Sequence, residues 1–178
     1  MVSTTTAKIR AVLFDRDGTL VVDVPYNGNP ALVRPMPGAR EVLDALRASG
    51  IATGVVSNQS GIARGLISEE DVASVNARVE ELLGPFDVWE FCPHSDQDKC
   101  SCRKPAPGMV HSACRKLGID ESEAALIGDI GADVLAAEAA GATGVLVPTP
   151  VTRAEEVAAA RLVARDLAGA VRLLREAQ

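Results

Sequence analysis

Short apolar runs alternate along the chain with longer segments in which apolar residues recur every three or four positions. The runs are rich in Val, Ile and Leu, and they cover residues 9–14, 51–56, 88–91, 124–127, 144–147 and 162–164. Runs of this length predict buried strands, and the intervening periodicity predicts helices. One helical segment carries Val72, Val75 and Val79, and Ser68 followed by Asp71 predicts a capping box where it begins.

Repeated strand–helix alternation predicts an α/β fold with a doubly wound parallel sheet that helices cover on both faces. The 178 residues are enough for one such domain and short for two. Helices, strands and loops already fill the intervals between the chemical motifs described below. We therefore expect one domain over residues 1–178, without a separate cap domain.

The composition excludes several classes of partner. The net charge of −6 and the pI near 5.0 provide no basic footprint for nucleic acid. Aromatic residues make up 3%, which argues against a base-stacking surface. Residues 1–8 are polar and lack the apolar core of a signal peptide, and no run approaches the ~20 apolar residues of a membrane helix. We expect a cytoplasmic protein that binds neither nucleic acid nor membranes.

The segment 14–20 places two carboxylates, Asp15 and Asp17, at the end of the first apolar run, with Gly18 directly after them. A divalent hard cation with oxygen ligands would remove the repulsion between the two charges. Asp15 could then act as a covalent nucleophile toward a phosphoryl group, and Asp17 as the acid that protonates the leaving oxygen. The alternative is an ordinary Asp-Gly turn after a strand, which is common.

A second acidic pair, Asp129 and Asp133, follows the run 124–127. Asp129 would complete a magnesium site with the first pair. Asp133 stands where a helix is expected to begin, so it either orients a metal-bound water or caps that helix.

Two further segments carry groups suited to phosphate. Ser57 follows the run 51–56, and its hydroxyl, with the backbone amides after it, could hold phosphate oxygens. Lys104, next to Arg103, could neutralise charge on a transferring phosphoryl group. Each signal is weak alone, because polar turns and basic pairs are common on protein surfaces. The combination in this order is much more specific.

This combination resembles the haloacid dehalogenase superfamily of phosphohydrolases. The resemblance implies a Rossmann-like sheet, a phospho-aspartate on the nucleophile, and a second aspartate that acts first as acid and then as base. It also implies Mg²⁺ held by two aspartate side chains and one backbone carbonyl. Applied to this chain, the resemblance implies that Asp15 is the nucleophile and that Asp17 is the acid and the carbonyl donor. It implies Ser57 and Lys104 as phosphate ligands, Asp129 as the second side-chain ligand of Mg²⁺, and Asp129 with Asp133 as the last motif.

Cys92, His94, Cys100 and Cys102 place four soft ligands within eleven residues. One imidazole and three thiolates suit tetrahedral Zn²⁺, and a full set of four ligands is typical of a structural site. The metal would then fold a loop, residues 92–102, that lacks an apolar core of its own. A chance cluster or a reactive Cys-x-Cys pair is the alternative.

Together with residues 57–65 and 102–109, this loop is similar to that of the D-glycero-D-manno-heptose 1,7-bisphosphate 7-phosphatases and the related histidinol-phosphatases. The narrower resemblance implies removal of the 7-phosphate of a sugar bisphosphate. It also implies that Arg103 contacts the substrate and that Asn58 lies near the transferring phosphate. Ile130 stands where the heptose enzymes usually carry Lys, and the loop 23–34 departs from their pattern.

Three functions therefore remain in play. The leading hypothesis is the hydrolysis of a small phosphorylated metabolite, and the favoured substrate is a sugar bisphosphate. The second is the same chemistry on histidinol phosphate or another small ester. The third is a non-catalytic scaffold organised by the zinc loop. A phosphomutase or transferase is disfavoured, since no cap domain would keep water from the phospho-aspartate.

Overall fold

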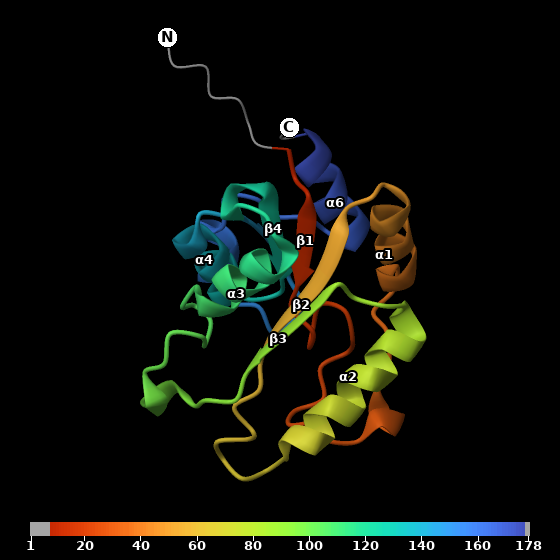
Figure 1. Ribbon diagram of the computed structural model, residues 1–178. Coiled ribbons are helices and arrows are strands. Elements are labelled where there is room, and N and C mark those ends of the chain that lie inside the picture. Colours follow the sequence, from red (N-terminus) through yellow and green to blue (C-terminus); the bar gives the residue numbers. More distant parts are fainter. Residues whose placement is uncertain (1–7, 177–178) are drawn as a thin grey trace.

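Five parallel strands form a single sheet in the computed structural model, which describes residues 8–176 (Figure 1). The order across the sheet is β3-β2-β1-β4-β5. The strands are β1 (Ala11–Phe14), β2 (Ala52–Asn58), β3 (Val88–Cys92), β4 (Ala124–Gly128) and β5 (Thr143–Leu146). Each coincides with one of the first five apolar runs. The prediction about the polar start of the chain concerned residues 1–8, of which all but Lys8 lie outside the described part.

Helices cover both faces of the sheet (Figure 1). One face carries α1 (Ala39–Ala48), α2 (Glu69–Leu83) and α6 (Leu167–Glu176), and the other carries α3 (Gly108–Leu117) and α4 (Gly131–Ala140). The short α5 (Ala154–Ala159) packs beside α4. Separate apolar cores fill the two interfaces, because residues of each strand point alternately to opposite faces. The predicted doubly wound α/β fold is confirmed.

The capping box predicted for α2 is present. The Asp71 amide donates to Ser68 Oγ at 3.0 Å, and the Ser68 amide donates to Asp71 Oδ2 at 2.8 Å. Two otherwise unpaired backbone groups are thereby satisfied where the helix begins.

The sixth apolar run does not form a strand. Within residues 162–164 only Val163 forms a bridge, to Leu146. The Leu146 amide donates to Leu162 O at 2.9 Å, and the Ala164 amide donates to Leu146 O at 2.8 Å. The run is only three residues long, because the chain enters α6 at Leu167. It therefore pairs with the end of β5 through a single bridge and does not form a sixth strand.

The strand order reverses at β1, which pairs with β2 on one side and with β4 on the other. In such sheets ligands bind in the crevice beyond the carboxyl ends of the strands at this reversal. Apart from isolated bridges at Asp17, Val21 and Pro35, the segments that leave β1 and β3 there contain only the one-turn helices η1 (Pro30–Leu32) and η2 (Asp96–Asp98). None of the described helices is long and apolar enough to cross a membrane.

Candidate active site

Three buried carboxylates meet at this reversal of strand order. Asp15 follows β1, Asp129 follows β4, and Asp133 lies in the first turn of α4. Because β1 and β4 run parallel and in register, their carboxyl ends lie together, and the Asp15 amide donates to Ile127 O at 2.9 Å. Each side chain offers an oxygen within 4.8 Å of the other two. A set of oxygen ligands alone fits a hard divalent cation such as Mg²⁺.

Gly18 makes room for Asp129. Its φ is +84°, in the left-handed region, and a Cβ at this position would lie 2.4 Å from Asp129 Oδ2. Both the backbone conformation and the close approach therefore require glycine. The Asp129 backbone is fixed from another side, where Thr152 Oγ1 donates to its carbonyl at 2.6 Å.

Lys104 supplies the counter-charge for the carboxylates. Its Nζ lies 2.7 Å from Asp15 Oδ1, 2.7 Å from Asp133 Oδ1 and 2.8 Å from Val56 O, and its side chain is 2% exposed. Asn58 holds the Lys104 backbone from both sides, since its amide accepts from Lys104 N at 3.0 Å and donates to Lys104 O at 3.1 Å. Asn58, predicted near the phosphate, thus also fixes the lysine.

Burial and charge crowding shift the pKa values of the site. Burial raises the pKa of Asp15 well above its usual range; Lys104 opposes this, while the neighbouring carboxylates add to it. Burial, followed by the charge of Asp133, raises the pKa of Asp129 to about 7. Burial alone would lower the pKa of Lys104, but Asp133 and Asp15 raise it above the usual value. One lysine leaves the cluster short of positive charge, which a divalent cation would provide.

Asp133 takes part in two interactions. Its Oδ2 accepts from the Ile130 amide at 3.2 Å, which caps α4, and its Oδ1 pairs with Lys104. The capping alternative left open by the sequence is therefore present. The ion pair with Lys104 was not foreseen, because Lys104 follows β3 in the sequence while Asp133 follows β4.

The Asp17 carboxylate points to other partners. Arg16 Nε donates to Asp17 Oδ1 at 3.1 Å and Arg16 Nη2 to Oδ2 at 3.0 Å, while Gln59 Nε2 donates to Oδ2 at 3.0 Å. Gln59 Nε2 also donates to the buried Ser57 Oγ at 2.8 Å, which joins the end of β2 to the acidic pair. That Asp17 binds the metal through its backbone carbonyl stays a prediction.

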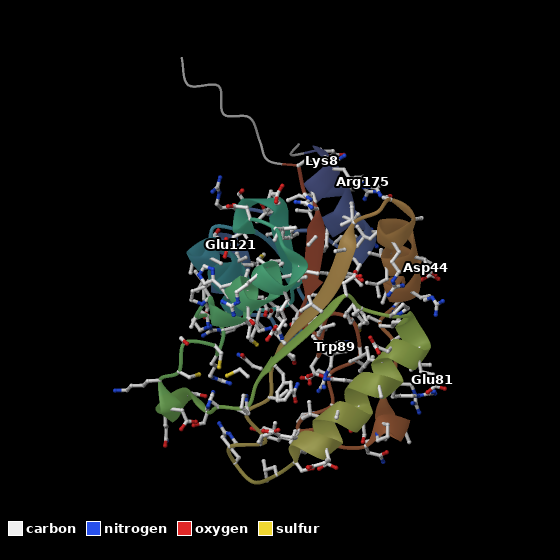
Figure 2. All side chains as sticks on the ribbon, viewed as in Figure 1. Lys8, Asp44, Glu81, Trp89, Glu121 and Arg175 are labelled. Carbon is white, nitrogen blue, oxygen red and sulfur yellow. The ribbon has the colours of Figure 1, made fainter. Side chains whose placement is uncertain are left out.

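The four predicted soft ligands also come together. His94 Nδ1 lies 3.5 Å from Cys92 Sγ and 3.3 Å from Cys102 Sγ, and Cys102 Sγ lies 3.5 Å from Cys100 Sγ and 2.8 Å from Cys92 Sγ. Figure 2 shows sulfur atoms gathered beside the loop that follows β3. None of the four cysteines is in a disulfide. Tetrahedral zinc would hold its sulfurs about 3.7 Å apart, so all but the shortest contact already fit.

The electrostatics of the loop favour a thiolate at Cys100 but not at its neighbours, because burial raises the pKa values of Cys92 and Cys102. Burial alone would raise the pKa of Cys100. Hydrogen bonds from the Arg103 amide and from Cys102 outweigh this effect and lower the pKa of Cys100 to about 6. The Arg103 side chain lies across the same loop, with Nη2 3.0 Å from Asp96 Oδ1 and Nη1 donating to His94 O at 3.4 Å. The loop therefore determines where Arg103 is held.

The sequence interpretation gave no role to Arg16, Gln59 or Asn76. Arg16 lies inside the first motif, and its burial is the unusual feature, since an arginine is rarely enclosed without a partner. Asn76 accepts from Arg16 Nη1 at 2.7 Å. No sequence signal marks Asn76, which is one polar residue on an amphipathic helix.

The site has the features of a haloacid dehalogenase-like phosphatase. These are an aspartate pair, a strand-end serine, a buried lysine and further acidic residues at one edge of a parallel sheet. A family model described as HAD-hydrolase-like matches residues 101–170. The D-glycero-beta-D-manno-heptose-1,7-bisphosphate 7-phosphatase of Vibrio cholerae is 38% identical over 163 residues, covering 84% of this chain and 88% of the relative. The same-named protein of Yersinia pestis is 38% identical over 177 residues, covering 92% and 94%.

A solved structure agrees with these relatives. The D,D-heptose 1.7-bisphosphate phosphatase from B. bronchiseptica, complexed with magnesium and phosphate, superposes with a TM-score of 0.82 at 29% identity, covering 94% of this chain and 99% of the other. The chain belongs to this family of haloacid dehalogenase-like phosphatases.

Proposed function

We propose that this protein removes the 7-phosphate of D-glycero-β-D-manno-heptose 1,7-bisphosphate in a Mg²⁺-dependent reaction that passes through a phospho-aspartate on Asp15. The observation that carries the proposal is the meeting of Asp15, Asp129 and Asp133 around Lys104 at the carboxyl ends of β1 and β4. The relatives' names supply the substrate, since two of them at 38% identity are phosphatases of this sugar.

The reaction has two steps, transfer of the phosphoryl group to Asp15 and hydrolysis of the phospho-aspartate. Asp15 attacks phosphorus, the bond from phosphorus to the sugar oxygen breaks, and Asp17 gives its proton to that oxygen. Asp17 then takes a proton from the water that attacks the phospho-aspartate, which releases inorganic phosphate and frees Asp15. The Ser57 hydroxyl holds phosphoryl oxygens, and the Lys104 ammonium group offsets the negative charge of the transferring phosphoryl group. Asn58 and Arg103 contact the substrate.

Two metals complete the site. Asp15, Asp129 and the Asp17 carbonyl would hold Mg²⁺, which when bound offsets the negative charge of the nucleophile and of the substrate phosphate. Cys92, His94, Cys100 and Cys102 would hold a structural Zn²⁺ that orders residues 92–102 and, through them, Arg103. Four free cysteines suit a reducing compartment, which supports a cytoplasmic location.

We expect the loop 23–34 to bear on substrate choice, because it leaves β1 directly after the first motif. Tyr26 packs against Gly61, and the Arg64 guanidinium lies over the Tyr26 ring, 5.9 Å from its centroid. Tyr26 thus links this loop to the segment that follows β2, although the sequence of the loop departs from the heptose pattern. Ile130 adds no positive charge near Asp129. A substrate panel therefore tests the sugar separately from the chemistry.

The test measures phosphate release with Mg²⁺ from both anomers of the heptose bisphosphate, from hexose bisphosphates and from histidinol phosphate. We expect the β-heptose to have the highest kcat/KM. Asp15→Asn should reduce kcat by on the order of 10⁴-fold or more while the circular dichroism spectrum is retained. A preference for histidinol phosphate would replace the substrate but keep the chemistry. Absence of turnover on every ester, with both metals bound, would favour the scaffold.

A further inference from the structure

Arg16 is the largest fully buried side chain among the described residues and is 1% exposed. Burying a guanidinium is costly unless its N–H groups are paired. Two of its nitrogens bind the two oxygens of Asp17, at 3.1 and 3.0 Å, and the third binds Asn76 Oδ1 at 2.7 Å. Every nitrogen of this buried cation is therefore engaged, with one carboxylate and one amide.

The two aspartates of the first motif have different cations. Asp15 pairs with Lys104, a single ammonium group that Asp133 shares. Asp17 pairs with Arg16 through two parallel hydrogen bonds, which fix the plane of a carboxylate as well as its position. The Asp17 side chain is 24% exposed, so without this fork it would be free to turn into solvent.

The hydrogen bonds distinguish the two oxygens of Asp17. A carboxylate has roughly four lone-pair sites. Arg16 occupies one on each oxygen, and Gln59 occupies the second site of Oδ2. The remaining site belongs to Oδ1, which is the oxygen left to carry a proton.

We infer that Arg16, anchored by Asn76 on α2, is the positioning residue that aims Asp17 Oδ1 at the leaving oxygen of the substrate. This inference rests on the proposed role of Asp17 as acid and base. Arg16 itself touches no reacting atom. Its removal should therefore impair protonation of the leaving group and leave attack by Asp15 on phosphorus largely intact.

The test compares two esters in kcat/KM, which covers the steps up to departure of the leaving group. The sugar ester needs a proton on its leaving oxygen, whereas p-nitrophenyl phosphate does not, since nitrophenolate leaves unprotonated. Arg16→Met should lower kcat/KM for the sugar ester by about 10²-fold, the lower end of what general acid catalysis contributes. For p-nitrophenyl phosphate the loss should stay below about threefold. Asp17→Asn should show the same selectivity with a larger loss.

Asn76 provides a second arm that leaves Arg16 in place. Asn76→Ala should cause the same selective loss, by about 3- to 10-fold, because Arg16 loses its anchor. Asn76→Asp keeps an acceptor oxygen and should restore most of the activity. Arg78→Met is the matched control on the same helix; Arg78 pairs with the exposed Glu81 at 2.6 Å, and its loss should change neither ester.

Thermal melts establish that each variant is folded, and the Asn76 variants decide the matter if Arg16→Met does not fold. Equal losses on both esters, or no loss on either, in folded Arg16 or Asn76 variants would overturn the positioning role. If Asp17→Asn itself showed no selectivity between the esters, the proposed acid–base role of Asp17 would be wrong, and the inference would fail with it.

Discussion

The carboxylate cluster and the Cys/His cluster lie at the same edge of the sheet but are assembled differently. Asp15 follows β1 and lies far along the sequence from Asp129 and Asp133, and all three are buried. The Cys/His ligands come from residues 92–102, and only Cys92 among them is buried. No residue from 93 to 101 is buried, so this loop has no apolar core.

The difference lies in what holds each cluster together without its metal. The sheet fixes the carboxylates, and Lys104 offsets part of their charge from within the protein. The thiols contact one another and His94, in a loop that has little other support. We therefore expect magnesium to bind to a site that already exists, and zinc to create the order of its own site.

Metal removal should give the largest effect. A chelator that strips zinc should reduce the protection of amides 94–103 from hydrogen exchange by orders of magnitude, whereas removal of Mg²⁺ should leave the amides of β1 and β4 protected. Cys102→Ser should reproduce the loss in the loop, and Ser101→Ala, an exposed neighbour, should not. Unchanged loop exchange after zinc removal would contradict the comparison.

Removal of the internal cation should give the next largest effect. Lys104→Met leaves Asp15 and Asp133 buried without their partner, which should lower the free energy of unfolding by about 3–5 kcal/mol at pH 8. Denaturant unfolding without Mg²⁺ measures this loss. Lys116→Met is the control, because Lys116 is 57% exposed and pairs with Glu90; its loss should cost about 0–1 kcal/mol. Similar small losses in both variants would mean that Lys104 does not hold the cluster.

The fit around Asp129 can be tested with two glycines that share a positive φ. Gly118, at +66°, has nothing within 4 Å of an added Cβ, so Gly118→Ala should cost about 1 kcal/mol from backbone strain alone. Gly18→Ala adds the contact with Asp129 and should cost a further ~1–3 kcal/mol. Isothermal titration should also show weaker Mg²⁺ binding for Gly18→Ala only. Equal behaviour of the two variants would show that Asp129 can move aside freely.

A pH dependence should be the smallest effect. The pKa of Asp129 is raised to about 7 from 3.8, and the pKa of Asp15 is raised as well, so the folded state retains protons that the unfolded state releases. Without metal, stability should therefore fall as the pH rises from about 4 to about 7. Mg²⁺ binding should strengthen over the same interval, since the metal displaces these protons. Asp129→Asn should flatten both trends, and a metal-free stability that rises with pH would contradict the shifts.

Local patterns predicted most of the fold. Five of the six apolar runs are strands, and the capping box of Ser68 and Asp71 is present where expected. The run 162–164 shows the limit of this reasoning, because its composition cannot reveal that the chain turns into α6 before a strand can extend. Burial on both faces explains why β1 and β4 were recognisable as continuous apolar runs.

The candidate site was predictable in its members but less so in its contacts. The acidic residues stand next to apolar runs, and the soft ligands stand close together in sequence, so both were visible. The partners of Arg16 and of Asp133 were not. Arg16 reaches Asn76 on α2, and Asp133 reaches Lys104 beyond β3, and no spacing along the chain encodes either contact.

By itself the sequence determined which residues could do the chemistry and which segments would be strands, since both depend on residue type and short-range periodicity. The tertiary structure alone decided how charges are paired: Lys104 between Asp15 and Asp133, and Arg16 between Asp17 and Asn76. The physical reason is that a charge pair depends on distance in space. That distance follows from the order β3-β2-β1-β4-β5 and from the packing of α2 and α4 on the sheet.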